Sequence, residues 1–232
     1  MPVGFRILQR RHRVDAATIE NFQALPVATI SDAMSRMFAA GPRLRPMHAG
    51  GPFAGAALTV RVRPGDNLMV HKALMLAEPG DVIVVDGGAD LTNALIGELM
   101  ISYARIVGVA GVVVDGAIRD SGWVRKNTFP VFAAGVTHRG PYKDGPGEIN
   151  VPVAIDGMVI NPGDLIVGDD DGLLCIPYGE TEKIYADAAR KAEAEARTLA
   201  DLAVGKLGSK KWVDDALARL GCEQQQATSG EG

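Results

Sequence analysis

The stretch VVVDGAIRD, residues 112–120, decides how the middle of this chain is expected to fold. Its run of valines is typical of a strand that is buried on both faces, as in a parallel sheet covered by helices. Within a few residues the run reaches a cation and a carboxylate side by side, Arg119 and Asp120. Because ligands of open α/β sheets bind beyond the carboxyl ends of the strands, a functional site is expected at this point.

Strands and helices alternate around this stretch. Apolar runs bounded by turn residues predict strands at 55–66, 82–88, 110–116, 129–135, 151–160 and 164–177. Apolar residues at helical spacing predict helices at 15–26, 29–37, 68–77, 93–108 and 120–127. Residues suited to the N-cap precede three of these helices, namely Asp15, Asn67 and Thr92. This order predicts a single α/β domain with a mixed central β-sheet or barrel-like core flanked by helices.

The C-terminal part has a different composition. Residues 179–206 are rich in Ala, Glu, Lys and Arg, which predicts one long helix, and a short helix is expected near 210–220. The long helix has little apolar stripe of its own, so it suits either an arm on a neighbouring subunit or a helix exposed to solvent. We therefore expect a domain over 1–178, a helical extension over 179–220 and a disordered polar tail over 221–232.

Composition excludes several classes of protein. Apolar residues make up 47% of the chain, charged residues 22%, and the formal net charge is −4, which is an ordinary globular balance without the basic excess of a nucleic-acid binder. Cys175 and Cys222 are too few for a disulfide framework. The first residues lack the apolar segment of a secretory signal, and no apolar run approaches the roughly 18 residues of a membrane span. We expect a cytoplasmic protein with neither nucleic-acid nor membrane partners.

Three features carry candidate chemistry. Arg119 offers a planar fork for a carboxylate and Asp120 a hard oxygen for a divalent cation, although for this pair taken alone an Asp at a helix start beside a surface Arg is the commoner arrangement. Glu98 lies among apolar neighbours, where it either emerges at a helix edge or acts as a base with a tuned pKa. The adjacent Gly97 indicates a close backbone approach or a local break. The run DGGADLTN, residues 86–93, could form a cradle of backbone amides for an anion.

Other chemistry finds less support. The histidines have no metal-ligand spacing, and the chain contains no G-x-S-x-G elbow of a serine hydrolase. A Schiff-base lysine would have to be buried, whereas Lys72, Lys126 and Lys143 fall in polar or loop settings. The acidic run at 168–173 predicts a hairpin or a bulge between two strands rather than a cation site. The triplet Pro-Gly-Asp, at 64–66, 79–81 and 162–164, predicts turns, and twice it stands just before an apolar strand.

Taken together, these residues resemble a known family. Twenty residues separate Glu98 from the Arg119-Asp120 pair. This spacing resembles the acid-x20-Arg-Asp signature of the class II pyruvate aldolases that cleave 4-hydroxy-4-methyl-2-oxoglutarate and 4-carboxy-4-hydroxy-2-oxoadipate. Further segments resemble the family in the same order, over roughly residues 15–180: RPGDNLMVHKAL, PGDVIVVDGG, GELM, GVAGVVVDGAIRD, FPVFAAGVT, GEINVPV and NPGDLIVGDDDG. The same RraA-like fold family, of the swivelling β/β/α type, includes regulators of ribonuclease E activity.

The resemblance implies a role for each residue. Asp120 would bind Mg²⁺ or Mn²⁺, with waters completing the shell. Arg119 would hold the keto oxygen and carboxylate region of the substrate and stabilise the enolate, and Glu98 would act through a water as the base. The backbone around Gly97 would bind the pyruvyl carboxylate, through the amides of Leu99 and Met100. Oxaloacetate should be decarboxylated at the same site, because that reaction passes through the same enolate.

The resemblance also implies an assembly, and in one respect it is incomplete. The family forms trimers or hexamers with the site at a subunit interface, to which a neighbour contributes an acid; Glu193 and Glu195 are candidates for it. Trp123 stands where the family's aldolases usually carry an acidic residue, three positions after the Asp. A non-catalytic regulator that binds ribonuclease E is therefore the alternative, whereas a methyltransferase would need a glycine fingerprint that the chain lacks.

Overall fold

The structure, a computed structural model, describes residues 3–223. The chain divides into two compact units, a core within residues 1–191 and a C-terminal unit within 192–232. No helix within the described part of the chain is long and apolar enough to cross a membrane. The expected disordered tail over 221–232 falls almost entirely on residues 224–232, which lie outside the described residues.

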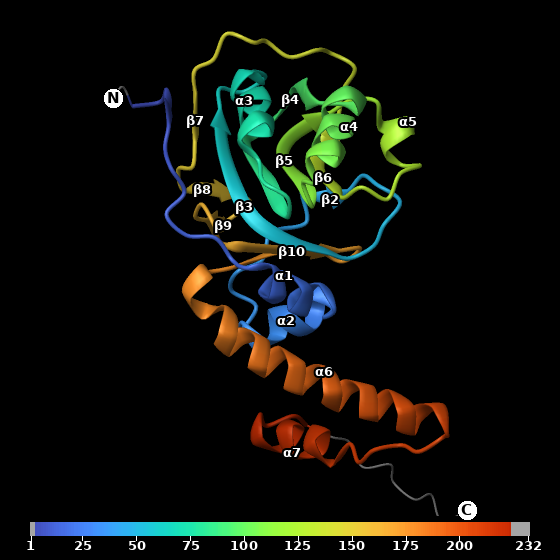
Figure 1. Cartoon of the computed structure of the whole chain (residues 1–232). Helices are drawn as coiled ribbons and strands as arrows, with labels where there is room; N and C mark the ends of the chain where they lie inside the picture. Colours follow the sequence, from blue (N-terminus) through green and yellow to red (C-terminus); the bar gives the residue numbers. More distant parts are fainter. Residues whose placement is uncertain (1–2, 224–232) are drawn as a thin grey trace, which may run out of the picture. The chain divides into compact units, whose positions relative to one another are not determined.

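The core is built on a mixed sheet of nine strands among the described residues (Figure 1). Seven of them follow one path, in the spatial order β1 (Arg6–Ile7), β7 (Gly147–Ile149), β3 (Phe53–Val62), β4 (Asp81–Ile96), β5 (Gly111–Ile118), β6 (Val131–Val136) and β2 (Arg45–Pro46). The central strands β3, β4, β5 and β6 are parallel, so their carboxyl ends meet at one edge of the sheet. This arrangement confirms the predicted α/β domain with a mixed sheet.

Antiparallel strands complete the core. The hairpin of β10 (Leu165–Asp169) and β11 (Gly172–Ile176) pairs with β3 through β10, which confirms the hairpin predicted around 168–173. A separate two-stranded sheet joins β8 (Val153–Ile155) to β9 (Met158–Ile160). These strands cover the face of the sheet that carries Val82, Val84 and Val113.

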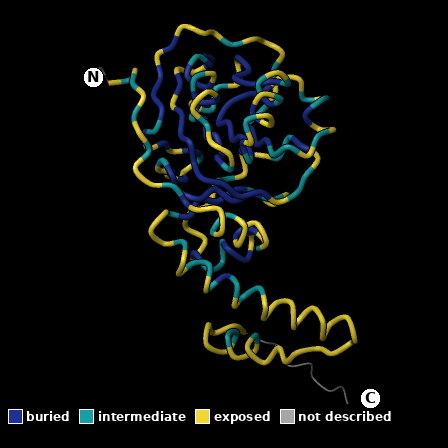
Figure 2. Tube along the Cα trace, in the orientation of Figure 1, coloured by how far each residue is buried: buried dark blue, intermediate teal, exposed yellow. Residues whose placement is uncertain are grey.

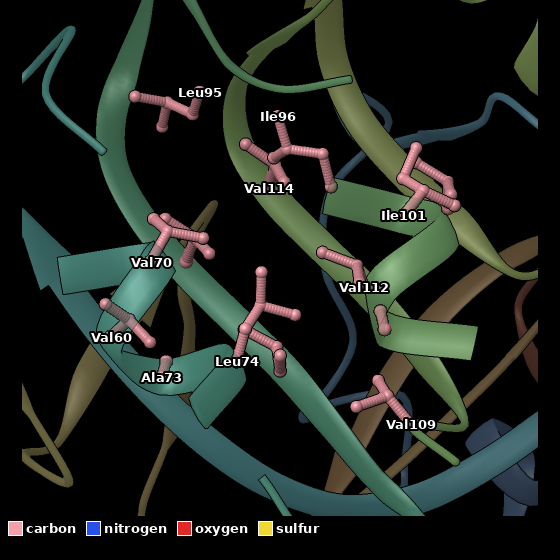
Figure 3. Packing of buried hydrophobic residues seen from close by; sticks show 14 of the residues in the cluster. Val60, Val70, Ala73, Leu74, Leu95, Ile96, Ile101, Val109, Val112 and Val114 are labelled. Carbon is pink, nitrogen blue, oxygen red and sulfur yellow. The ribbon is translucent and has the colours of Figure 1, made fainter. Parts of the chain in front are cut away.

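Helices α3 (Leu68–Leu76) and α4 (Glu98–Val107) cover the opposite face. Figure 3 shows how their apolar side chains interlock with those of the strands: Val70 and Leu74 from α3 and Ile101 from α4 lie among Val112 and Val114 of β5. All these side chains are buried, in agreement with the continuous apolar runs of the sequence. The core therefore fixes both helices, and with them the ends of the loops that connect them to the sheet.

The remaining helices of the core also follow sequence signals. Asp15 caps α1 (Ala16–Gln23) as predicted, because its carboxylate accepts the backbone N–H of Thr18 at 2.7 Å. Helix α2 (Val27–Ala33) starts earlier and ends sooner than the predicted 29–37, since Ser35 and Arg36 adopt left-handed backbone angles. The shorter elements are α5 (Ser121–Val124) and a 3₁₀ turn, Tyr178–Glu180.

The predicted helix over 93–108, with Thr92 as its cap, is wrong in its first part. Strand β4 continues to Ile96, and α4 begins only at Glu98. The pairing of β4 with β5 shifts register three times between Asp86 and Ile96, so the strand takes up extra residues as bulges. The run 86–93 is consequently part of an irregular strand rather than the strand-to-helix turn that an anion cradle requires.

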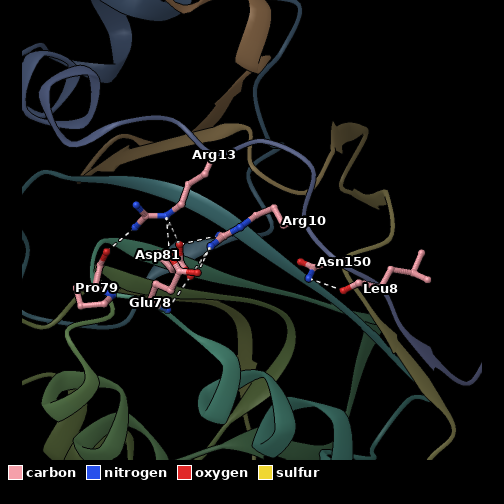
Figure 4. Close-up of polar contacts among 7 residues, drawn as sticks. All are labelled: Leu8, Arg10, Arg13, Glu78, Pro79, Asp81 and Asn150. Atoms are coloured by element: carbon pink, nitrogen blue, oxygen red, sulfur yellow. Dashed lines mark hydrogen bonds and ion pairs between the residues drawn. The ribbon is translucent and has the colours of Figure 1, made fainter.

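The N-terminal segment is fastened to the core by a buried charge. Asp81 is fully buried at the start of β4 and binds two arginines, Arg10 through Nη1 at 2.7 Å and Arg13 through Nε at 3.0 Å (Figure 4). Its second oxygen also accepts the backbone N–H of Glu78. Two guanidinium partners and a backbone donor satisfy the carboxylate, so we assign this cluster a structural role.

Helix α6 (Thr181–Ala203) begins in the core, where Ala188 is buried, and ends in the C-terminal unit. That unit also contains α7 (Lys211–Arg219), so the predicted long and short helices are both present. Most of its residues are exposed (Figure 2). Among them are six large apolar side chains: Leu199, Leu202, Val204, Leu207, Trp212 and Leu220.

Candidate active site

The end of β4 and the start of α4 are joined by one residue, Gly97. Helix α4 begins at Glu98, and its first backbone hydrogen bond runs from the N–H of Ile101 to the carbonyl of Gly97 at 3.1 Å. The N–H groups of Leu99 and Met100 precede that bond, so they have no acceptor within the helix. Free N–H groups at a helix N-terminus form a binding site for a carboxylate.

The end of β5 lies beside this helix start. The backbone N–H of Arg119 donates to the carbonyl of Ile96 at 3.0 Å, which ties the two strand ends together. Asp120 then adopts a left-handed conformation, with φ of 57°, a conformation that Asp tolerates better than most residues. This turn places its Oδ2 2.9 Å from the backbone nitrogen of Glu98, whose N–H it accepts, and 3.7 Å from Nε of Arg119.

The absence of a side chain at Gly97 makes this arrangement possible. A Cβ atom there would lie 2.8 Å from Cγ and 3.2 Å from Nε of Arg119, and would also overlap Oδ2 of Asp120. The backbone itself is extended and would accept other residues. The close backbone approach that the sequence indicated at this glycine is therefore present, and its partner is the Arg119-Asp120 pair.

A pocket of about 290 Å³ opens in front of these residues. It is lined by Asn67, His71, Ala94, Leu95, Ile96, Gly97, Leu99, Met100, Arg119, Gly140, Pro141 and Lys143. The side chains of Arg119 and Asp120 are 43% and 41% exposed, so both reach solvent at the carboxyl end of the strands. The backbone of Glu98 and the side chains of Arg119 and Asp120 thus lie at one place, and of these three residues only Arg119 lines the pocket.

A connecting segment, residues 139–146, closes one side of the pocket, and we call it the strap. The side-chain amide of Asn93 donates to the carbonyl of Gly140 at 2.5 Å, and the N–H of Ala94 donates to the carbonyl of Arg139 at 2.8 Å. Gly140 lies close to the guanidinium, since a Cβ on it would be 3.5 Å from Nη1 of Arg119. The strap therefore adds a wall that originates far along the chain.

Eight lining residues were not among the predicted site residues: Asn67, His71, Ala94, Leu95, Ile96, Gly140, Pro141 and Lys143. Asn67 was expected only as a helix cap, whereas its side chain donates to the carbonyl of Leu95 at 2.9 Å and is 2% exposed. The Pro-Gly-Asp triplet before Asn67 predicts a turn, but it does not predict which residues the turn will contact.

The donor set fits a hydrated divalent cation at Asp120. No group of three or more His, Cys, Asp and Glu side chains within residues 3–223 is placed to hold a metal. Asp120 nevertheless offers a half-exposed carboxylate whose Oδ2 is fixed by Glu98, which leaves Oδ1 for a ligand. Mg²⁺ commonly keeps several waters and one or two carboxylates, so a single aspartate is sufficient. Trp123 is half-buried and packs against the apolar core, so it offers no oxygen ligand.

The fold and the site define an α/β protein with a pocket at the carboxyl ends of parallel strands, lined by the start of α4 and by Arg119. A sequence model of the RraA-like family, described as Aldolase/RraA, matches residues 27–175. The chain therefore belongs to the RraA-like family, and this match contains the whole strand sequence from β3 to β10 together with the pocket.

Similar proteins carry two kinds of name. A protein of Halalkalibacterium halodurans, provisionally named 4-hydroxy-4-methyl-2-oxoglutarate aldolase, is 43% identical over 77% of this chain and 86% of its own length. A Thermus thermophilus protein with that name is 40% identical over 54% of this chain and 76% of its own. The solved structure of the RNA-processing inhibitor RraA from Thermus thermophilis superposes with a TM-score of 0.61 and 34% identity, covering 66% of this chain and 92% of that one.

Proposed function

We propose that this protein is a class II pyruvate aldolase that uses a divalent metal to cleave 4-hydroxy-2-oxo acids with further carboxylates, such as 4-hydroxy-4-methyl-2-oxoglutarate or 4-carboxy-4-hydroxy-2-oxoadipate. The names of its relatives support this substrate class. The observation that carries the proposal is the hydrogen bond from the Glu98 backbone to Asp120, because it holds the Arg119-Asp120 pair at the N-terminus of α4. Oxaloacetate decarboxylation is proposed as a side activity.

Substrate binding follows from the two strand ends. The carboxylate on C1 accepts the N–H groups of Leu99 and Met100, which have no acceptor within α4. The guanidinium of Arg119 then donates to the keto oxygen on C2 and to the adjacent carboxylate, since its fork matches two neighbouring oxygens. The reacting bond between C3 and C4 is thereby held in front of the pocket.

Cleavage requires a base and a stabilised oxygen. Glu98 takes the proton of the C4 hydroxyl through a water, and the C4 oxygen forms a carbonyl as the bond between C3 and C4 breaks. The bonding electrons move to the C2 oxygen and give the enolate of pyruvate, whose negative charge Arg119 stabilises. A proton delivered to C3 then completes pyruvate. With 4-hydroxy-4-methyl-2-oxoglutarate both products are pyruvate.

A divalent cation, Mg²⁺ or Mn²⁺, is the implied cofactor, and Asp120 would hold it. When bound, it would lower the energy of the enolate as a Lewis acid, an effect worth several kcal/mol. The residues of the chain contribute the rest: the fixed position of the carboxylate, the neighbouring guanidinium and the helix amides.

The proposal is tested by measuring pyruvate. The purified protein should release pyruvate from 4-hydroxy-4-methyl-2-oxoglutarate and from oxaloacetate in the presence of Mg²⁺, and EDTA should abolish both activities until excess Mg²⁺ restores them. The spontaneous decarboxylation of oxaloacetate by free Mg²⁺ is the control. Turnover of neither substrate with Mg²⁺ or Mn²⁺ would contradict the proposal.

The similarity to an RNA-processing inhibitor and the presence of Trp123 favour a second candidate, a regulator that binds ribonuclease E. In that case the protein would inhibit RNA cleavage by purified ribonuclease E and would be captured by it. An Asp120→Asn variant separates the two candidates, because it should lose aldolase activity and keep any inhibition.

We also propose that the protein assembles as a trimer or hexamer with the pocket at a subunit interface. Apolar side chains next to the pocket are exposed on the core, with Met75 at 68%, Leu99 at 81%, Tyr103 at 47% and Ile106 at 86%. An exposed apolar surface of this kind is typical of an interface. Of the extension over 179–220, the part beyond Lys191 would pack on a neighbouring subunit, and Glu193 or Glu195 would be its candidate acid.

A further inference from the structure

A groove runs between the N-terminal segment, residues 5–13, and helix α3. Two adjoining hollows form it, one of about 440 Å³ and one of about 720 Å³, and Ile7 lines both of them. The smaller hollow lies beside the start of α3, at Leu68, and the larger one beside its end, at Leu76. The N-terminal wall of this groove precedes residues 27–175, so it lies outside the part of the chain that the RraA-like family model matches.

The backbone along the larger hollow lacks hydrogen-bond partners. The last contact of the segment with the sheet is the N–H of Leu8, which donates to the carbonyl of Ile149 at 3.0 Å, just beyond the end of β1. Within the described part of the chain, no hydrogen bond reaches the backbone N–H or C=O groups of residues 9–13. Unpaired groups that continue an edge strand are a template on which another strand can be added.

Asn150 adds a buried acceptor to the wall of the larger hollow. Its Nδ2 donates to the carbonyl of Leu8 at 2.9 Å (Figure 4), and this bond fixes the orientation of the amide. Its Oδ1 is buried and has no hydrogen-bond partner among the described residues. A buried polar atom without a partner is costly, so the occupant of the hollow is expected to supply a donor.

Several cations of the groove are already paired with buried carboxylates. Asp81 binds Arg10 at 2.7 Å and Arg13 at 3.0 Å, so both guanidinium groups are fixed at the wall of the larger hollow (Figure 4). In the smaller hollow, Nε of Arg6 lies 2.7 Å from Oε1 of Glu148. These pairs therefore leave little charge for an occupant.

Two other cations of the lining remain unpaired. Arg11 in the larger hollow and Lys72 in the smaller one have no ion-pair partner within residues 3–223. Glu78 is the only carboxylate in either lining, and it lies 3.7 Å from Arg10 and 3.9 Å from Arg13. An occupant that fills both hollows thus meets two uncompensated positive charges.

We propose that this groove binds an extended acidic segment of another protein, which adds a strand along residues 9–13. Five residues of strand span about 17 Å. Carboxylates of the segment pair with Arg11 and Lys72, its backbone provides a donor for Asn150, and its apolar side chains cover Ile7. The unpaired backbone groups favour a polypeptide over a lipid or a small organic anion, because a polypeptide supplies donors and acceptors in a regular row. This binding is independent of the proposed aldolase function.

A labelled peptide tests the proposal on the full chain. The probe is a fluorescein-labelled heptapeptide that alternates valine with glutamate, and fluorescence anisotropy follows its binding. The wild type should bind this peptide, and should bind the same peptide with lysine in place of glutamate at least about tenfold more weakly. Methylation of every second backbone nitrogen of the acidic peptide should weaken its binding at least about tenfold, since strand pairing needs those donors.

Variants of the groove locate the binding. Arg11→Glu reverses an exposed charge and should weaken binding of the acidic peptide at least about fivefold. Lys72→Glu repeats this test in the smaller hollow. Arg197→Glu is the matched control, because Arg197 is exposed on α6 and outside both linings, so its affinity should equal that of the wild type. If circular dichroism shows that one groove variant has lost its fold, the other one decides.

Four results would overturn the proposal. The first two are the absence of wild-type binding up to about 1 mM peptide and equal affinity for the acidic and the basic peptide. The others are undiminished binding of the methylated peptide and an equal loss of affinity in Arg11→Glu and Arg197→Glu. Light scattering adds a further check: a changed assembly mass in Arg11→Glu with unchanged peptide affinity would assign the groove to an interface between copies of this chain, and would overturn the proposal as well.

Discussion

At Gly97 the strand β4 gives way to the helix α4, and Arg119 and Asp120 lie against the space that a side chain would occupy. Gly97→Ala should therefore displace both side chains and lower kcat/KM at least about tenfold, while the overpacked site costs roughly 1–3 kcal/mol of folding free energy. Pyruvate release and urea unfolding measure the two effects. Gly122→Ala is the matched control, because a Cβ on Gly122 meets no atom within 4 Å. Equal activity of both variants would disprove this role of Gly97.

Asp120 is the residue through which a metal is expected to act. Asp120→Asn keeps an oxygen that can accept the N–H of Glu98 but removes the negative charge, so Mn²⁺ affinity should fall at least about tenfold and turnover should be lost. Mn²⁺ binding is measured by calorimetry or electron paramagnetic resonance, independently of activity. Asp90→Asn, in the irregular part of β4, should bind Mn²⁺ as the wild type does. Unchanged Mn²⁺ affinity in Asp120→Asn would contradict the assignment.

Residue-level prediction succeeded where the chemistry is local. Arg119 and Asp120 directly follow a recognisable buried strand, and Gly97 interrupts an apolar run, so both could be found from the sequence. Lys143 and His71 could not, because what matters is the contact between the strap and α3. That contact depends on Asp66, whose distance of some eighty residues from the strap leaves no pattern in a single sequence.

At the scale of elements, the sequence identified the central strands and the helices of the core. It missed the short strands β1, β2 and β7, predicted one strand over 151–160 where the chain forms the antiparallel pair β8 and β9, and placed the end of β4 in a helix. A short apolar run such as Ala94–Leu95–Ile96 suits a buried strand and a buried helix equally. Pairing with β5 decides in favour of the strand, and the register shifts allow these side chains to be buried without a continuous alternation. No local sequence signal encodes this pairing with β5, which extends the strand to Ile96. Helix α4 therefore starts only at Glu98, and the backbone of Glu98 lies beside Asp120.

The three Pro-Gly-Asp turns have a role beyond starting strands. Each of their aspartates, Asp66, Asp81 and Asp164, is buried and accepts backbone N–H groups. Asp81 holds the N-terminal segment through two arginines, and Asp66 holds the strap. The sequence predicted the turns correctly, whereas the burial of their carboxylates follows from the packing of distant segments.

The strap should release from α3 in acid. Burial acts to raise the pKa of Asp66, but the N–H groups of Leu68, Asp144 and Gly145, together with Arg63, outweigh it, so the pKa is lowered. A lowered pKa contributes stability that is present above the ordinary carboxyl pKa of about 4 and is lost as the pH falls through the value in the folded protein. Stability should therefore decrease below about pH 4.

The contribution of Asp66 is isolated by substitution. Asp66→Asn turns an amide donor toward backbone N–H groups and should cost about 1–3 kcal/mol at pH 7, with a weaker pH dependence below pH 4 than the wild type shows. Urea unfolding at several pH values measures both. Asp144→Asn is the control, since the Asp144 side chain is exposed and only its backbone binds Asp66. The same pH dependence in wild type and Asp66→Asn would show that the strap is held by other contacts.

At the scale of the whole molecule, the core fold brings four distant segments to one edge of the sheet. The turn before α3, the start of α4, the end of β5 and the strap together line the pocket. Parallel strands made part of this predictable, because their carboxyl ends share one edge. The strap lies at the same edge because it connects β6 to β7, which are not neighbours in the sheet. Its position, like the assembly of subunits, is decided by packing rather than by local sequence.

The C-terminal unit offers the sharpest test of the proposed assembly. Residues 193–200 of α6 are all exposed, and the unit exposes six large apolar side chains, whereas Ala188 and the ion pair of Lys191 with Asp32 belong to the core. A chain that ends at Lys191 should therefore keep its fold, with a Tm within about 5 °C of the full chain.

If the extension packs on a neighbouring subunit, light scattering of this truncated chain should show a smaller assembly, and its kcat/KM should fall because the neighbour's acid is missing. A chain that ends at Glu223 should behave as the full chain does. A truncated protein with the full assembly mass and full activity would show that the extension serves neither the interface nor the site.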